Sequence, residues 1–177
     1  TPVYTLGRKM ARLATMRTSI HRIRSLVRGE VVEYEEGVNV NIWSKRDIPI
    51  YTSAEGPKTL KMSGEIADGV IVGSGVYKET VEWVLRHLND GIAERQDNLG
   101  AMDIIFGAVV SVDRDGHAAR EKVRSRVANR AHHNFRMTLD SVPEEYQPEI
   151  QNLLDNFDVS NWRHPKHVPL ITDYILD

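Results

Sequence analysis

The sequence predicts an α/β protein in which parallel strands are joined by helices. Three apolar runs have the length of strands, and each is followed by a turn rich in glycine, proline or aspartate and then by a helical segment. Because the connections are short and strand and helix alternate three times, we expect parallel strands with helical crossovers. The chain has 177 residues, of which 41% are hydrophobic and 27% charged. This length and balance fit a single α/β unit over residues 1–177, without a linker that would divide it.

The N-terminal part is expected to contain one long helix. Apolar residues recur at three- and four-residue spacing from Met10 to Val27, and Gly29 follows, which predicts a helix that ends at about Arg28. The opposite side of this helix is rich in arginine, and we interpret it as a solvent-exposed face. Residues 30–43 predict a loop with one short extended piece.

Three strand–helix units follow along the chain. They consist of residues 48–54 with 58–67, residues 70–72 with 77–94, and residues 103–112 with 117–138. Pro57 fits the first position of the helix over 58–67, because its missing N–H has no partner there in any case. Val70–Val72 is a continuous apolar run, which predicts a strand buried on both faces. Beyond Ser141 the sequence predicts one more helix over residues 142–156 and a loop over residues 162–167.

Composition excludes several classes of protein. Without cysteine the chain has no disulfide scaffold, thiolate metal site or cysteine nucleophile. No apolar run is long enough to cross a bilayer, and the first residues lack the basic and apolar blocks of a secretory signal. We therefore expect a cytoplasmic protein with no membrane partner. The formal net charge of −2 gives no reason to expect nucleic acid as a partner.

Two turns between a strand and the next helix are rich in small residues. Ser53–Pro57 and Gly73–Gly75 allow a ligand close to the backbone, and the free N–H groups at the start of each following helix favour a phosphate. In parallel α/β proteins ligands bind at this end of the strands. Small residues at such turns also serve tight packing alone, so the spacing leaves both interpretations open. Neither turn has the spacing of a dinucleotide-binding loop or a P-loop.

Other groupings of reactive side chains predict structural roles. The adjacent pair His132–His133 points in different directions on a helix and cannot share a metal. A proline separates His164 from His167, which favours a surface loop over a zinc site. Asp113 and Asp115 match helix-capping chemistry better than they match a general base. The sequence thus predicts no metal site and identifies no catalytic residue.

Residues 49–73 closely resemble one known family. The strand, the Ala54–Pro57 turn, the helix that ends in Gly64–Val70 and the next strand occur in the order typical of luciferase-like flavin- or deazaflavin-dependent oxidoreductases. Residues 1–14 are similar to a family segment that leads into a helix, and residues 110–115 with the helix after them also fit. The resemblance covers most of the chain and weakens after about Thr138.

The resemblance implies a fold, a cofactor and a set of binding residues. The fold would be a (β/α)8 TIM barrel, and the cofactor would be FMN or coenzyme F-420, which carries out the hydride or oxygen chemistry on a small-molecule substrate. One turn would line the cofactor, and the other would hold its phosphate. The lining residues would be Ser53, Ala54, Glu55, Gly56 and, on the following helix, Thr59; the phosphate residues would be Gly73, Ser74 and Gly75.

The length of the chain implies that the barrel is partial. A complete barrel needs roughly 200 to 250 residues, so the chain resembles about the second half of the barrel, without its first strands. Half a barrel leaves two unpaired strand edges and an uncovered inner face. We therefore expect either a fragment that lacks its N-terminal half or a subunit that completes its sheet in a homo-oligomer. Two alternatives stay open, a non-catalytic half-barrel module that associates with a partner and an unrelated flavodoxin-like domain.

Overall fold

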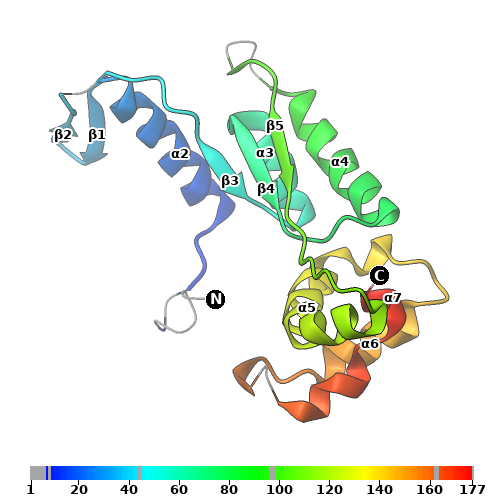
Figure 1. Ribbon diagram of the computed structural model, residues 1–177. Coiled ribbons are helices and arrows are strands. Elements are labelled where there is room, and N and C mark those ends of the chain that lie inside the picture. The colour runs from blue at the N-terminus through cyan, green and yellow to red at the C-terminus, as the bar shows by residue number, and fades with distance from the viewer. Residues whose placement is uncertain (1–6, 8, 44, 96–98, 162–163, 177) are drawn as a thin grey trace.

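Helices and short strands alternate along the chain (Figure 1). The computed structural model describes residues 7, 9–43, 45–95, 99–161 and 164–176. The family resemblance over residues 1–6 and the loop predicted at residues 162–163 lie outside these ranges.

Three parallel strands form the central sheet, as predicted. They are β3 (Tyr51–Ser53), β4 (Gly69–Val72) and β5 (Asp103–Phe106), in the order β3-β4-β5. In the register, Tyr51 lies opposite Gly69, and Gly69 lies opposite Asp103. β5 is shorter than the apolar run over 103–112 predicts. The Gly107 N–H still donates to the Val72 carbonyl at 2.7 Å, and the chain then leaves the sheet.

Helices α3 (Pro57–Ile66) and α4 (Lys78–Ile92) are the crossovers and cover one face of the sheet (Figure 1). Pro57 lies in the first turn of α3, as predicted. The two helices approach closely because they meet at glycine: a Cβ on Gly91 would lie 2.0 Å from the Lys61 carbonyl oxygen. The core between these helices and the sheet consists of Ala54, Leu60, Val70, Val72, Trp83, Val84 and Leu88.

Helix α2 (Leu13–Val27) lies within the predicted range and packs against α3 through Ile20. A buried arginine fixes its position. Arg24 Nη2 donates to the Asp68 carboxylate at 2.8 Å, and the Ile50 N–H donates to the same oxygen at 2.7 Å. Burial would raise the pKa of Asp68, but these two hydrogen bonds outweigh it and lower the pKa. Asp68 therefore holds α2 to the beginning of β3 as an ionised carboxylate.

A β-hairpin follows α2, where the sequence predicts a loop. Strands β1 (Val32–Glu35) and β2 (Val38–Val40) pair antiparallel. Gly37 between them has a φ of 74°, and its N–H donates to the Glu33 carboxylate at 3.0 Å. The prediction of one short extended piece is wrong, because glycine in the left-handed conformation lets the chain reverse and pair with itself.

The C-terminal helices form a second cluster below the sheet in Figure 1. They are α5 (Gly116–Thr138), η2 (Leu139–Ser141), α6 (Gln147–Asn156), η3 (Val159–Asn161), η4 (Pro165–Leu170) and α7 (Asp173–Leu176), the η elements being 3-10 helices. Their shared core consists of Ala128, Ala131, Phe135, Val142, Ile150, Leu153, Phe157 and Ile171.

The boundaries of these helices agree in part with the sequence prediction. α5 covers the predicted range, and the Asp115 side chain caps it by accepting a hydrogen bond from the His117 N–H at 3.0 Å. α6 begins later than residue 142, after a turn that starts at Pro143. The surface loop predicted around His167 is wrong: η4 occupies residues 165–170, and His167 is buried and accepts a hydrogen bond from the Asp158 N–H.

One face of the sheet is exposed. Ile71 and Ile105 are 44% and 43% exposed, and Tyr51 beside them is 40% exposed. The prediction that Val70–Val72 is buried on both faces is therefore wrong in this structure. Helices cover the face of Val70 and Val72, while nothing in the described chain covers Ile71. β3 and β5 are the edge strands of the described sheet.

Candidate functional site

A cavity of about 650 Å³ lies beyond the carboxyl ends of β4 and β5. One wall is the turn Gly73–Tyr77, and a second is the segment Gly107–Val109; α5 and α7 complete it. Ligands of parallel α/β proteins bind at this end of the strands, and small-molecule sites have volumes of roughly 300–1,000 Å³. Position and size therefore suit a small molecule.

Ser74 lines this cavity and has a buried hydroxyl that is unsatisfied among the described residues. The residue is 4% exposed, and its Oγ has no hydrogen-bond partner among the described residues. A buried polar group without a partner costs about 1–3 kcal/mol. A ligand atom that accepts a hydrogen bond from Ser74 would remove this cost.

Gly73 lets α5 approach the end of β4. Its carbonyl accepts hydrogen bonds from Arg130 Nε at 3.0 Å and from Asn134 Nδ2 at 2.6 Å. A Cβ at this position would lie 1.3 Å from Arg130 Nη2 and 2.9 Å from a carboxylate oxygen of Glu55. A side chain at this position would therefore displace the guanidinium of Arg130.

Glu55 connects the two predicted turns. Its Oε1 accepts a hydrogen bond from Arg130 Nη2 at 2.8 Å, while Arg130 also binds the Gly73 carbonyl. The other oxygen of Glu55 lies 2.9 Å from His133 Nε2, an ion pair when His133 is protonated. The β3–α3 turn, the β4–α4 turn and α5 are therefore held together around one guanidinium.

The other residues predicted for the first turn do not line the cavity. Ser53 ends β3 and is exposed, whereas Ala54 is buried in the core and its N–H donates to the Ile71 carbonyl at 3.2 Å. The Thr59 hydroxyl donates to the Gly56 carbonyl at 2.8 Å. Of the eight predicted residues, the three of the second turn, Gly73, Ser74 and Gly75, line the cavity.

Helix α5 supplies cavity residues that the sequence did not indicate. The polar residues of α5 that line the cavity are Arg126, Asn129, Arg130 and Asn134. Three of them follow one another at four-residue spacing, which places them on one side of the helix. This spacing was visible in the sequence, but nothing in it connects α5 to a turn more than 50 residues earlier.

Two tyrosines, Tyr77 and Tyr174, also line the cavity. The rings of Tyr77 and Tyr174 meet edge to face, with centroids 6.0 Å apart. Burial, together with the neighbouring Tyr77, raises the pKa of Tyr174 above its ordinary value. Its hydroxyl therefore stays protonated at neutral pH and can donate a hydrogen bond.

The remaining predicted groupings have local roles. Asp113 binds Lys122, and Asp115 caps α5 as predicted. Within the described ranges no three His, Asp or Glu side chains gather closely enough to hold a metal ion. No helix in the described part of the chain is long and apolar enough to cross a membrane.

Fold and cavity together place the chain among the α/β proteins with a cavity at the carboxyl ends of parallel strands, the position at which such proteins bind their ligands. The sequence profile of the luciferase-like monooxygenase family matches residues 4–161. The chain therefore belongs to this family, and the resemblance seen at residues 49–73 is confirmed.

Three similar proteins have named activities. The 5,10-methylenetetrahydromethanopterin reductase of Archaeoglobus fulgidus is 32% identical over 122 residues, which cover 66% of this chain and 36% of the relative. The F-420-dependent glucose-6-phosphate dehydrogenase of Beutenbergia cavernae is 31% identical over 121 residues, which cover 64% of this chain and 36% of the relative. The solved structure of the coenzyme F-420 dependent tetrahydromethanopterin reductase from Methanopyrus kandleri superposes with a TM-score of 0.61 and 24% identity.

The matches cover only part of these proteins. The chain spans about a third of the length of the curated relatives, at 36% for both. The structural match covers 91% of this chain and 48% of the solved one. At this identity the structural match shows the fold, an α/β arrangement of parallel strands and helices.

Proposed function

We propose that the chain forms the cofactor-phosphate half of an oxidoreductase that uses coenzyme F-420. Membership of the luciferase-like monooxygenase family supports an enzyme of this chemistry. The names of a similar dehydrogenase and of the similar solved structure include F-420, which favours this cofactor over FMN. The substrate would be a small molecule bound beside the cofactor.

The observation that carries the proposal is the unsatisfied Ser74 hydroxyl in a turn of small residues beside the cavity. A phosphate oxygen would accept its hydrogen bond, and Gly73 and Gly75 allow a phosphate close to the backbone. Among the described residues no Asp or Glu lines the cavity, so none of their carboxylates repels an anion there. The residues present therefore fit the phosphate end of the cofactor.

The chain's own residues would bind and orient the cofactor. When bound, coenzyme F-420 supplies the hydride chemistry. Ser74 would donate to the phosphate, while Arg130 fixes the turn through the Gly73 carbonyl and Glu55. Ser53, Ala54, Glu55, Gly56 and Thr59 would line the rest of the cofactor, as the family resemblance implies.

The exposed face of the sheet supports a partial barrel. Tyr51, Ile71 and Ile105 lie on a face that no described element covers. In a closed barrel this face would point inward and contact further strands. We propose that the N-terminal half of the barrel, or another copy of the chain, covers it in the functional protein.

Cofactor titration tests the proposal. The purified chain, shown to be folded by circular dichroism, is titrated calorimetrically with F-420 and, separately, with FMN. We expect saturable binding of F-420 and a rise in Tm with its concentration, because a ligand of the folded state stabilises it. FMN is expected to bind more weakly. A folded chain that binds neither compound contradicts the proposal.

A second candidate function is a non-catalytic half-barrel module that associates with a partner. It is favoured by the positions of Ser53, Ala54, Gly56 and Thr59, which lie outside the cavity although the resemblance places them at the cofactor. A folded chain that stays monomeric in light scattering and binds no F-420 would support this module.

A further inference from the structure

The hairpin β1–β2 lies at the C-terminal end of α2, and β2 is its outer strand (Figure 1). Strand β1 contacts the rest of the chain: Val32 is buried, and Arg22 Nη1 on α2 donates to the Tyr34 carbonyl at 3.2 Å. All three residues of β2 are exposed, and among the described residues β1 is the strand with which β2 pairs. β2 is therefore an edge strand, with one row of backbone N–H and C=O groups open to a further strand.

The residues along this edge do not oppose pairing. Soluble proteins protect exposed edges with charged side chains, with proline or with a bulge. Residues 38–42 have the sequence Val-Asn-Val-Asn-Ile, without a charge or a proline, and the irregularity in the register of the hairpin lies on β1. A two-stranded hairpin is at best marginally stable in water, so a further strand would stabilise it.

The same five residues match a second copy of themselves. In an antiparallel pair centred on Val40, this residue would face Val40 of the other copy, Val38 would face Ile42, and Asn39 would face Asn41. Side chains alternate between the two faces of a strand, so the apolar side chains share one face and the asparagines the other. Val38, Val40 and Ile42 are 47%, 38% and 39% exposed. Each cross-strand pair then joins similar side chains, which stabilises a sheet.

The charges of the hairpin also favour a second copy at β2. Glu33 and Glu35 lie on β1. Pairing through β2 leaves the two β1 strands three strand spacings apart, about 14 Å, which exceeds the Debye length of about 8 Å at physiological ionic strength. Pairing through β1 would instead bring the glutamates of two copies together. Opposite charges meet at the ends of the β2 pair, since the register brings Glu36 of one copy toward the exposed Lys45 of the other.

We propose that the outer edge of β2 is a docking surface for a second copy of this chain. The two copies form one four-stranded antiparallel sheet in the order β1-β2-β2-β1, with a two-fold axis at Val40. The same residues contact each other from both sides, as in other two-fold interfaces. In this register Trp43, which is 96% exposed, lies opposite Gly37 of the other copy. The contact is separate from the exposed face of the central sheet and does not depend on the proposed activity.

Disulfide cross-linking of single-cysteine variants tests the proposal. The chain contains no cysteine, so one introduced cysteine can form a disulfide only between copies. Directly opposite residues of antiparallel strands have Cα atoms about 4.5–5.5 Å apart, within the disulfide range of roughly 4.4–6.8 Å. We expect Val40→Cys to form a covalent dimer under mild oxidation, seen on a non-reducing gel and reversed by a thiol. Circular dichroism before oxidation shows that the variant is folded.

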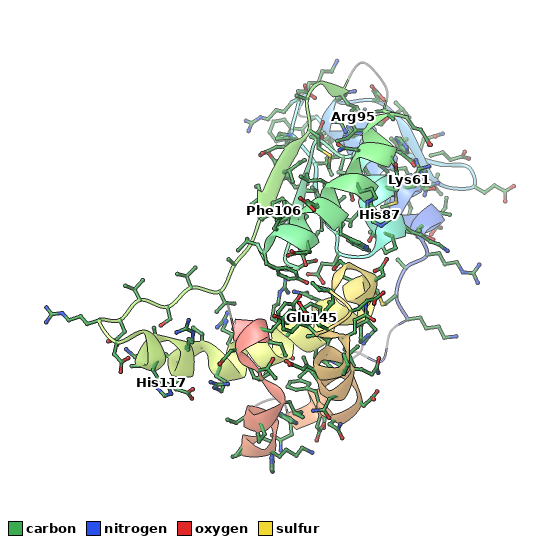
Figure 2. All side chains as sticks on the ribbon, turned by 90° about the vertical axis from the view of Figure 1, so that its right-hand side faces the viewer. Lys61, His87, Arg95, Phe106, His117 and Glu145 are labelled. Atoms are coloured by element: carbon green, nitrogen blue, oxygen red, sulfur yellow. The ribbon has the colours of Figure 1, made fainter. Side chains whose placement is uncertain are left out.

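Two control variants separate the specific contact from random collision. Val38→Cys lies on the same face of the same strand, but the register places the two cysteines roughly 13–14 Å apart, too far for a disulfide. Val110→Cys lies in the extended segment between Phe106 and His117 (Figure 2), and Val110 is 76% exposed, more than Val40. Both controls should dimerise at least tenfold more slowly than Val40→Cys.

A mixture of two variants tests the register without a change at Val40. Val38→Cys and Ile42→Cys, each slow to dimerise alone, should together give a covalent dimer with one copy of each. Equal rates for Val40→Cys and Val38→Cys, or a folded Val40→Cys that stays monomeric while the mixture also fails to cross-link, would overturn the proposal.

A further variant distinguishes this contact from association through the central sheet. In the double variant Ile71→Lys with Val40→Cys, the rate of dimer formation should equal that of Val40→Cys. A fall to the rate of Val110→Cys would assign the contact to the exposed sheet face and overturn the docking edge. If the chain cross-links through Val40→Cys but never binds F-420, the proposed function fails and the docking edge stands.

Discussion

Gly73 leaves space that the guanidinium of Arg130 occupies. It is not among the glycines with positive φ, so its backbone conformation is open to other residues. A Cβ would nevertheless overlap the guanidinium of Arg130. We predict that Gly73→Ala destabilises the chain by about 1–3 kcal/mol, because Arg130 must leave Glu55 and the Gly73 carbonyl. The shift of the urea midpoint measures this loss.

Gly107→Ala is the matched control for this prediction. Gly107 also lies at the end of a strand and lines the same cavity, but a Cβ there would meet only the Val72 carbonyl oxygen at 3.6 Å, an ordinary contact. Its urea midpoint should stay close to that of the wild type. Equal urea midpoints for the two variants would show that the Arg130 side chain moves aside at little cost and that its contacts contribute little to stability.

The sequence indicated one side of the candidate site and missed the other. Gly73–Gly75 was recognisable because small residues at a strand-to-helix turn have a direct physical meaning. Arg126 and Asn134 were not, because an arginine on a helix is usually solvated and only the packing of α5 brings these residues to the turn. Which of several Arg and Asn side chains reaches a distant loop depends on tertiary contacts that local pattern does not contain.

At the level of elements, α5 is held to the helices after it by buried histidine. His132 is 8% exposed and stacks on Phe157, with ring centroids 5.0 Å apart. Burial, and then the positive charge of Arg136, lowers the pKa of His132 below 6.5. The folded chain therefore keeps His132 neutral at pH values at which the unfolded chain protonates it.

This difference predicts the pH dependence of stability. Neutral His132 makes its full contribution to the free energy of unfolding above about pH 6.5, the ordinary pKa of histidine. This contribution is lost as the pH falls toward the lowered pKa that His132 has in the folded chain. We expect the urea midpoint of the wild type to fall more between pH 7.5 and 5.5 than that of His132→Gln. The pKa of His21 is lowered as well, but that residue is present in both proteins and cancels in the comparison.

His117→Gln is the control for the pH measurement. His117 lies on the same helix but is exposed. Its variant should follow the wild type over the whole range. If His132→Gln shows the same pH slope as the wild type, proton binding at His132 does not contribute to stability.

The long helices and the order of the parallel strands were predictable, whereas the hairpin and the end of β5 were not. α2, α4 and α5 each have an apolar stripe or a clear cap, and their ranges agree with the sequence within about three residues. The hairpin β1–β2 was missed because its pairing depends on one left-handed glycine, Gly37. β5 was predicted too long because an apolar run shows only that a segment can pair, and pairing beyond Gly107 needs a neighbour.

At the scale of the whole molecule, buried hydrophobic side chains of the described residues gather in three clusters. One lies between the sheet and its helices, one lies among the C-terminal helices, and a small one joins α2 to α3. Polar contacts connect the first two, through Arg130, Asn134 and the Gly73 carbonyl. The candidate site therefore lies where the described parts of the protein meet, and Ile71 of the exposed sheet face also lines its cavity.

The exposed face of the sheet, which includes Ile71 and Ile105, is expected to promote association of the chain with further copies. Ile71 and Ile105 are nearly half exposed on adjacent parallel strands, and edge strands with apolar neighbours favour contact with further chains. We predict that the 177-residue chain self-associates and that Ile71→Lys weakens this association about tenfold or more, since burying one isoleucine contributes about 1.5–3 kcal/mol. Sedimentation velocity over a concentration series measures the change.

Val168→Lys places the same charge on an equally exposed valine of η4, away from the sheet, and should associate like the wild type. A wild type that stays monomeric at all concentrations, or a Val168→Lys variant that dissociates as readily as Ile71→Lys, would show that the sheet face needs no cover and would remove the main structural support for a partial barrel.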